Sequence, residues 1–175
     1  AKFIFKSMLN EDSNYFEDES EYPNLTFNEI KDVLKTKYNQ LMDGNETRPL
    51  FIEGVSGIGK TSLGKCLSEE LNSHYLIRNM QFMERPDFMG LQYIENEVTH
   101  FARPKFLPEK GKGILLFDEA NRVESDIRSG FLTLLEDKNI NGHEISKEYL
   151  VYLAGNHVND DYETEDFDIA LKDRM

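Results

Sequence analysis

FIEGVSGIGKTS, Phe51 to Ser62, places a glycine-rich loop between a short apolar run and a segment of helical spacing. Residues Gly54 to Thr61 match the pattern G-x-x-x-x-G-K-[ST], which wraps the backbone around phosphate groups. The run LFIE before it is typical of a buried strand, and apolar residues follow it at helical spacing: Leu63, Cys66, Leu67 and Leu71. An accidental match is expected in only about one chain of this length in 150 to 200. The stretch therefore predicts a strand, a phosphate-binding loop and a helix rather than an ordinary glycine-rich turn.

The predicted loop supplies several kinds of phosphate ligand. Its glycines let consecutive backbone N–H groups point inward, and the positive end of the following helix adds to them. The ammonium group of Lys60 is the expected partner of the β- and γ-phosphates, and the hydroxyl of Thr61 is an expected Mg²⁺ ligand. Cys66 is expected to pack in the core rather than to act as a reactive thiol. The candidate nucleotide-binding residues are Gly54, Val55, Ser56, Gly57, Ile58, Gly59, Lys60, Thr61 and Ser62.

A pair of acidic residues follows the strand predicted over GILLF, residues 113–117. We expect Asp118 to assist the Mg²⁺ ion through its water shell, and Glu119 to act as the general base that polarises a water molecule. An acidic turn after a strand is common in α/β proteins, so the pair gains its weight from the phosphate-binding loop that precedes it. A small-molecule kinase does not need a water-activating glutamate. The pair therefore favours hydrolysis of ATP by water over phosphate transfer to another acceptor.

A further polar residue follows the strand predicted over EYLVYLA, residues 148–154. In P-loop ATPases with an additional central strand, a polar residue at this tip contacts the γ-phosphate or the attacking water, and Asn156 has the matching chemistry. The alternative is an asparagine that favours the turn after a strand. The order along the chain favours the functional interpretation, because the phosphate-binding loop, the Asp-Glu pair and Asn156 follow one another.

Strands alternate with helices along the chain. Further strands are predicted over residues 50–53 and 74–79, and helices over residues 26–42 and around 127–135. Asn141-Gly142 predicts the turn of a small hairpin. The alternation predicts an α/β fold in which helices cover both faces of a mainly parallel sheet.

The composition is that of an acidic chain with one free thiol. The 175 residues carry a net charge of -13, which opposes non-specific binding to nucleic acid or to an anionic membrane but is compatible with a local basic groove. Cys66 is the only cysteine, and no apolar run approaches the ~18 residues of a membrane span, so a cytoplasmic location is expected. Residues 11–21 are rich in acid and lack a basic residue. We expect residues 1–24 to form an N-terminal extension with an acidic linker.

Four ordered stretches resemble the AAA+ ATPases, and within them the MoxR-like, dynein-related branch: GVSGIGKTS, ARPKFLPEKGKGILLFDEANRV, SGFLTLLED and VYLAGNHVNDDYETEDFDIALKDRM. The resemblance covers residues 25–175 and implies a P-loop NTPase three-layer sandwich, with Walker A at 54–61, Walker B at 114–119 and sensor 1 at Asn156. It also implies a ring, a hexamer in most members, with ATP and Mg²⁺ at each subunit interface. Arg174 matches the arginine finger that one subunit lends to the γ-phosphate of its neighbour. The helical lid that follows in this family is expected to be missing from these residues.

A long connection, residues 80–112, is predicted to be the insert that faces the pore of the ring in this branch. It holds basic and aromatic residues that are candidates for substrate contact: Phe101, Arg103, Lys105 and Phe106. The alternative is that the two phenylalanines pack beneath the loop while the basic residues are solvated. Asn79, at the end of the preceding strand, is a further candidate for restraining Glu119. Arg122 is expected to pair with a nearby acidic residue, and the alternative is that it faces a neighbouring subunit.

We expect an ATPase core that hydrolyses ATP with Mg²⁺ at ring interfaces and uses the cycle to remodel a protein partner. The expected catalytic residues are Glu119, Asn156 and Arg174. One alternative is a nucleotide-gated assembly module with little turnover, and another is a subunit of a nucleic-acid-processing machine. The negative charge disfavours direct nucleic-acid binding, and no membrane contact is expected.

Overall fold

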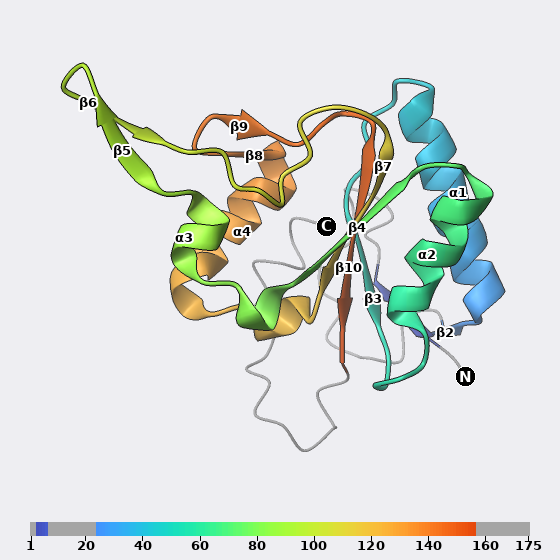
Figure 1. The fold of residues 1–175 in the computed structure, drawn as a ribbon. Helices are drawn as coiled ribbons and strands as arrows, with labels where there is room; N and C mark the ends of the chain where they lie inside the picture. Colours follow the sequence, from blue (N-terminus) through green and yellow to red (C-terminus); the bar gives the residue numbers. More distant parts are fainter. Residues whose placement is uncertain (1–2, 7–23, 157–175) are drawn as a thin grey trace, which may run out of the picture.

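The computed structural model describes residues 3–6 and 24–156, and a six-stranded sheet forms its centre (Figure 1). The strand order is β2 (Asn24–Leu25), β1 (Phe3–Lys6), β3 (Leu50–Glu53), β10 (Tyr149–Gly155), β7 (Gly113–Asp118) and β4 (His74–Asn79). The last four strands are parallel to one another, while β1 is antiparallel to both β2 and β3. The expected mainly parallel sheet is confirmed. The pairing of β1 with β3 is an addition that the sequence pattern did not predict.

Helices cover both faces of the sheet and make three layers (Figure 1). One face carries α1 (Phe27–Met42) and α2 (Lys60–Glu70), and the other carries α3 (Arg85–Met89) and α4 (Ser125–Asp137). Because side chains alternate along a strand, β7 contributes to two separate cores. Ile114 and Leu116 belong to the core beneath α1 and α2, whereas Leu115 and Phe117 belong to the core beneath α4. These four side chains are 0% exposed, which confirms a strand buried on both faces.

Local chemistry decides where the first two long helices begin. Thr26 caps α1 in a capping box, in which its hydroxyl accepts from Glu29 N at 3.4 Å and its own N–H donates to the Glu29 carboxylate at 2.6 Å. The start of α2 at Lys60 follows Gly59, whose φ of 106° is a conformation that glycine adopts without steric cost. Both starts agree with the expected helices.

The long connection, residues 80–112, has structure of its own. It contains η2 (Met80–Phe82), α3, and the antiparallel hairpin of β5 (Gln92–Glu95) and β6 (Val98–Phe101), which projects from the body of the molecule (Figure 1). A smaller hairpin, β8 (Asn139–Ile140) and β9 (His143–Glu144), follows α4 and turns at Asn141-Gly142 as predicted. Within the described ranges, no helix is long and apolar enough to cross a membrane.

The face of α2 that meets the sheet is made partly of small residues. Gly64 and Ser68 are buried on it, together with Leu63 and Leu67. Cys66 lies outside this face and is exposed, so the expectation that it packs in the core was wrong. The apolar spacing of α2 was compatible with more than one buried face, and the small residues mark the one that the structure uses.

Two tyrosines, Tyr75 on β4 and Tyr152 on β10, explain why the buried face of α2 carries small residues. Their hydroxyls lie 3.2 Å apart, and they donate to the first carbonyls of α2, from Tyr75 to Thr61 O at 2.7 Å and from Tyr152 to Lys60 O at 3.3 Å. A Cβ atom on Gly64 would lie 2.4 Å from the Tyr152 hydroxyl and 2.5 Å from the Tyr75 ring. Burial raises the pKa of Tyr75 to about 12, so its hydroxyl stays protonated and able to donate at neutral pH. Gly64 thus lets the tyrosine pair support the start of α2.

Gly64→Ala is expected to destabilise the protein by about 1–3 kcal/mol, because the new methyl group overlaps both tyrosines. At an exposed position of a helix the same change would stabilise the protein by roughly 0.5–1 kcal/mol. The sign of the change in unfolding free energy therefore shows whether the close approach matters. Urea unfolding followed by circular dichroism measures the difference. Lys65→Ala, at the exposed neighbouring position, is the control and is expected to stay within about 0.5 kcal/mol. A Gly64→Ala protein as stable as its parent would show that the close approach is not a constraint.

Candidate active site

Three neighbouring strand ends bring the predicted site residues together. Strands β3, β10 and β7 are adjacent and parallel, so the segments that follow them lie at the same edge of the sheet. β3 leads into the phosphate-binding loop, β10 ends just before Asn156, and β7 ends in Asp118. Because β10 lies between the other two strands, Asn156 lies between the loop and the acidic pair.

The phosphate-binding loop, residues 54–59, has the curled backbone that its glycines predict. Gly57 and Gly59 have φ values of 76° and 106°, a region that other residues rarely adopt. A Cβ atom at Gly57 would meet no described atom within 4 Å, so this side of the loop is open. The N-terminal end of α2, at Lys60, adds N–H groups and the positive end of the helix dipole. The loop therefore has the shape and polarity of an anion cradle.

The ammonium group of Lys60 is already oriented by oxygen atoms at this edge. Nζ lies 2.6 Å from Gly54 O, 2.9 Å from Asn156 Oδ1 and 3.2 Å from Val55 O, and the residue is 7% exposed. These acceptors are uncharged, and a phosphate oxygen in their place would form a stronger, charge-assisted hydrogen bond. The position of Lys60 fits its expected role.

Thr61 and Asp118 form the pair that fits a magnesium ion. The hydroxyl of Thr61 donates to Asp118 Oδ2 at 3.0 Å, and Asp118 Oδ1 accepts from the N–H of Glu119 at 3.1 Å. Hydroxyl and carboxylate oxygens are ligands that Mg²⁺ prefers in phosphate-transfer sites. Thr61 would bind the ion directly and Asp118 through water, and the ion would neutralise charge on the phosphates.

Glu119 is held next to Asn156 in a strained conformation. Asn156 Nδ2 donates to both carboxylate oxygens, at 3.0 Å and 3.1 Å. The backbone of Glu119 has φ 52° and ψ 39°, a left-handed geometry that costs a non-glycine residue about 1–2 kcal/mol. Such strain persists where the surroundings fix the residue, and it clusters at functional sites. Arg122 Nε lies 3.3 Å from Glu119 Oε2, which confirms the expected pairing of Arg122 with a nearby acid.

Asn79 does not restrain Glu119, so that expectation was wrong. Its Oδ1 accepts from Gln81 N at 3.0 Å and caps η2. The carboxylate of Glu119 is contacted by Asn156 and Arg122 instead. The turn directly after β4 uses the asparagine locally, as strand-end asparagines often do.

Two residues that position Asn156 were missed from the sequence. Asn121, in η3 (Ala120–Arg122), donates from Nδ2 to Asn156 O at 3.0 Å. Gly155 allows this approach, because a Cβ atom there would lie 2.9 Å from Asn121 Oδ1 and 2.7 Å from the ring of Phe51. The available signals were the asparagine after the acidic pair and the glycine at the end of an otherwise bulky strand.

Of the two aromatic residues in the expected substrate-facing cluster, Phe106 packs inside the protein. Phe106 is 4% exposed and stacks on Phe88 with ring centroids 5.6 Å apart. The prediction that this residue contacts a partner was therefore wrong, and the alternative, packing beneath the loop, is confirmed for it. Phe101 is half-buried, and its carbonyl lies 2.8 Å from His143 Nε2. The Phe106 ring is therefore not an open contact, while the expected role of Phe101 stays a prediction.

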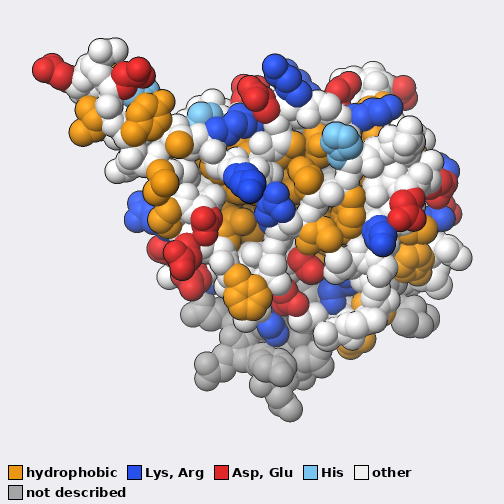
Figure 2. Space-filling view, in the orientation of Figure 1, with side chains coloured by type: hydrophobic (Ala, Val, Ile, Leu, Met, Phe, Trp, Pro, Cys, Tyr) orange, Lys and Arg blue, Asp and Glu red, His pale blue; other side chains and the backbone are white. Residues whose placement is uncertain are grey.

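The basic part of the cluster lies at a groove beside β4. Lys105 is exposed, whereas Arg103 donates to Leu107 O at 3.3 Å and to Glu144 O at 2.7 Å. Both line the groove together with Arg78, whose pKa is lowered by burial. Figure 2 shows basic side chains next to hydrophobic ones on this face of the molecule.

Two further predictions concern residues outside the described ranges. Arg174, the expected arginine finger, and the acidic stretch of residues 11–21 both lie there. Their expected roles therefore stay predictions.

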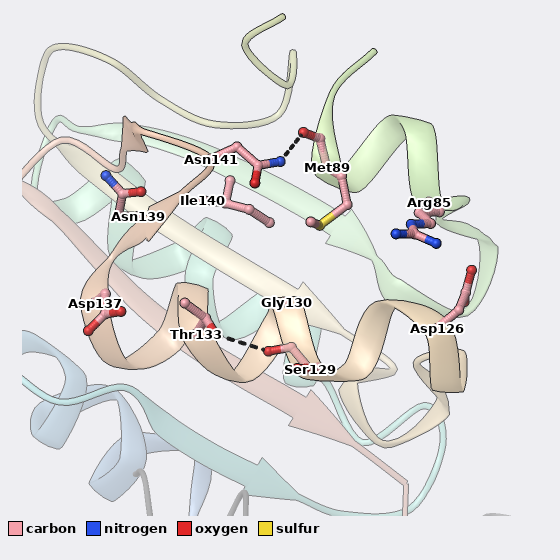
Figure 3. Close-up of a pocket in the computed structure, with 10 residues that line it drawn as sticks. All are labelled: Arg85, Met89, Asp126, Ser129, Gly130, Thr133, Asp137, Asn139, Ile140 and Asn141. Atoms are coloured by element: carbon pink, nitrogen blue, oxygen red, sulfur yellow. Dashed lines mark hydrogen bonds between the residues drawn. The ribbon is translucent and has the colours of Figure 1, made fainter. Parts of the chain in front are cut away.

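A separate cavity of about 620 Å³ lies between α3, α4 and the β8–β9 hairpin (Figure 3). Ser129, Gly130 and Thr133 line it from α4, and Asn141 closes one end by donating to Met89 O at 2.8 Å. Neither Glu119 nor Asn156, the catalytic candidates among the described residues, lines this cavity. We therefore assign the chemistry to the strand ends.

Among curated proteins, relatives of this chain include subunits of replication factor C. Small subunit 2 from Pyrobaculum arsenaticum is 26% identical over 113 residues, covering 63% of this chain and 35% of that protein. Subunit 4 from Saccharomyces cerevisiae is 30% identical over 95 residues, covering 54% of this chain and 29% of that protein. The chain thus spans about a third of the length of these relatives.

The fold is similar to that of RuvB from Thermotoga maritima, described as a Holliday junction branch migration motor. The two superpose with a TM-score of 0.55 at 16% identity, covering 85% of this chain and 42% of RuvB. At this identity the likeness shows the fold alone, and the MoxR-like assignment stays a prediction. Residues 49–175 match the family of AAA domains of the dynein-related subfamily, so the chain belongs to this family of AAA+ ATPases, whose members bind ATP with Mg²⁺.

Proposed function

We propose that this chain hydrolyses ATP as the catalytic core of a ring-forming AAA+ machine. The observation that carries the proposal is the continuous line of hydrogen bonds from Lys60 through Asn156 to Glu119. It lies beside the pair Thr61 and Asp118, so phosphate, metal and water ligands converge at one edge of the sheet. A phosphate-binding loop alone would fit a kinase or a switch protein equally well. The carboxylate of Glu119 next to the Asn156 amide favours water as the attacking group.

Each residue has a separate part in the proposed reaction. Lys60 exchanges its oxygen partners for β- and γ-phosphate oxygens and releases the amide of Asn156. Its Oδ1 can then accept from the attacking water, and its Nδ2 can donate to the γ-phosphate. Glu119 accepts a proton as the water oxygen attacks phosphorus and the bond to the bridging oxygen breaks. Arg174 of a neighbouring subunit would neutralise charge in the transition state, as the sequence predicts. The site is therefore completed by a second copy, and we infer a ring, with a hexamer as the expected size.

We propose further that the machine processes nucleic acid. The relatives are named for replication and for branch migration, and these names support this alternative better than the remodelling of a protein partner. The groove lined by Arg78, Arg103 and Lys105 is a local basic region in a chain whose net charge is -13. Such a region is the minimum that a phosphate-backbone contact needs.

Remodelling of a protein partner is the second candidate, and the β5–β6 hairpin favours it. Its exposed apolar side chains reach 78% exposure at Ile94 and 54% at Val98. Glu95 and Glu97 at the turn repel phosphate, and Figure 2 shows hydrophobic and acidic side chains together on the projecting hairpin. A two-stranded hairpin is marginally stable alone, and exposed apolar surface marks contact sites for polypeptides.

Glu119→Gln is expected to lower ATP turnover about 100-fold to 10,000-fold, because an amide cannot accept the proton of the attacking water. Binding of a fluorescent ATP analogue should be retained, since the phosphate ligands are unchanged. Lys60→Ala should instead lose binding. Glu109→Gln, at an exposed position, serves as the control and should behave as the parent protein. Unchanged hydrolysis in Glu119→Gln would remove this residue from the role of general base.

Duplex or branched DNA is expected to raise the rate of ATP hydrolysis severalfold at low salt, with an effect that falls as salt rises. Lys105→Gln should weaken DNA binding and reduce the slope of log affinity against log salt by about one, because one phosphate contact is lost. Lys37→Gln, on α1 at the opposite face of the sheet, should leave the slope unchanged. Fluorescence anisotropy with labelled DNA over a salt series measures both slopes.

Stimulation by an unfolded polypeptide such as casein, and none by DNA, would instead support the second candidate. In that case Ile94→Ser should remove the stimulation, because it takes apolar surface from the hairpin. Gln92→Ser, on the same hairpin, should retain it.

A further inference from the structure

We propose that Arg122 is a positioning residue, which restrains the carboxylate of Glu119 and ties it to the first turn of the insert. The inference rests on the proposed function, because it concerns the general base of the proposed hydrolysis. The observation behind it is a chain of contacts that runs from Gln81 in η2, through Arg122 in η3, to Glu119.

The guanidinium of Arg122 joins two elements at once. Nε lies 3.3 Å from Glu119 Oε2, and Nη1 donates to Gln81 Oε1 at 3.3 Å. The side chains of Arg122 and Glu119 are 22% and 20% exposed, so their contact is partly shielded from solvent. A guanidinium is planar and presents donors in several fixed directions, which a lysine does not. Arginine is therefore the side chain that can hold both acceptors in this arrangement.

The register of the sheet fixes where the two turns meet. β4 pairs with β7 so that Asn79 lies opposite Asp118, and η2 and η3 follow directly from these strand ends. Asn79 caps η2 through Gln81 N at 3.0 Å, which sets the position of Gln81. Met80 and Ala120 are 0% exposed and anchor the two turns in the core. Asn79 thus fixes the position of Gln81, which contacts Arg122, and it forms no hydrogen bond with Glu119 itself.

Glu119 is restrained from two directions that respond to different events. Asn156 holds it from one side, and Asn156 Oδ1 is bound to Lys60, so nucleotide binding alters this contact first. Arg122 holds it from the side of the insert. Oε2 accepts from Asn156 Nδ2 and lies 3.3 Å from the positively charged Arg122 Nε, which leaves this oxygen less able to take a proton from water. Movement of η2 would withdraw Arg122 and release the carboxylate.

Arg122→Met is expected to raise basal kcat about fivefold, with KM for ATP changed less than twofold, because the chain of phosphate ligands is untouched. Gln81→Leu should act in the same direction but by about twofold, and the double variant should not exceed Arg122→Met alone, since both remove one linkage. Arg122→Lys keeps a cation beside Glu119 but loses the second contact with Gln81, so its kcat should match that of Gln81→Leu rather than that of Arg122→Met. Arg85→Met, in α3, is the matched control and should leave kcat unchanged. Steady-state kinetics and thermal unfolding of each variant supply the data.

The outcomes separate this inference from the proposed hydrolysis. Suppose that turnover of the parent protein depends on Glu119, and that kcat is unchanged or lower in Arg122→Met and Gln81→Leu. The proposed restraint is then wrong, while the proposed hydrolysis stands. If the parent protein shows no ATP turnover and Arg122→Met does, the result supports both the restraint and the hydrolysis. If parent and variants bind ATP and none of them turns it over, both fail. Gln81→Leu decides the question if Arg122→Met does not fold.

Discussion

The amide of Asn156 joins the two charged groups on which the site depends. Its oxygen accepts from Lys60 Nζ at 2.9 Å, and its nitrogen donates to the Glu119 carboxylate at 3.0 Å and 3.1 Å. A partly buried ammonium and carboxylate are stable only when their hydrogen-bonding groups are satisfied. One amide contacts both and keeps them apart, which an aspartate or a leucine could not do, and Gly54 O, Val55 O and Arg122 supply further partners. The bridge requires β10 between β3 and β7, so the strand order is itself part of the site.

Local patterns predicted β3, β7 and β10 because each is a nearly continuous buried run with side chains in both cores, and they predicted β4, at the edge of the sheet, from a shorter apolar run. The strands over residues 50–53 and 74–79 agree with the structure to the residue, and α1 begins after Thr26 as expected. Cys66 and Phe106 were misplaced for opposite reasons. The apolar spacing of α2 predicted that Cys66 lies in the core. The structure instead buries the face that carries Gly64, which packs against the two tyrosines. Basic neighbours made Phe106 look exposed, although its ring packs on Phe88.

Contacts between turns could not be predicted, because they depend on the register of strands that are distant in sequence. The pairing of Asn79 with Asp118 brings η2 next to η3, and a slip of one residue would separate Gln81 from Arg122. No periodicity within either segment carries this information. The antiparallel pairing of β1 with β3 is of the same kind, since a short strand does not encode its own neighbour.

The insert is fixed at both ends and exposed in the middle, and this arrangement limits how it can act on the site. Met80 at one end is 0% exposed and Phe106 at the other is 4% exposed, whereas Ile94 between them is 78% exposed. Movement of the hairpin therefore reaches the core through the buried side chains of the insert, among them Met80, Phe88 and Phe106. Met80 lies in η2, beside the turn that carries Arg122, and Phe106 contacts Phe117 with ring centroids 6.1 Å apart, directly before Asp118. A load on the hairpin would therefore arrive next to the carboxylates of Asp118 and Glu119.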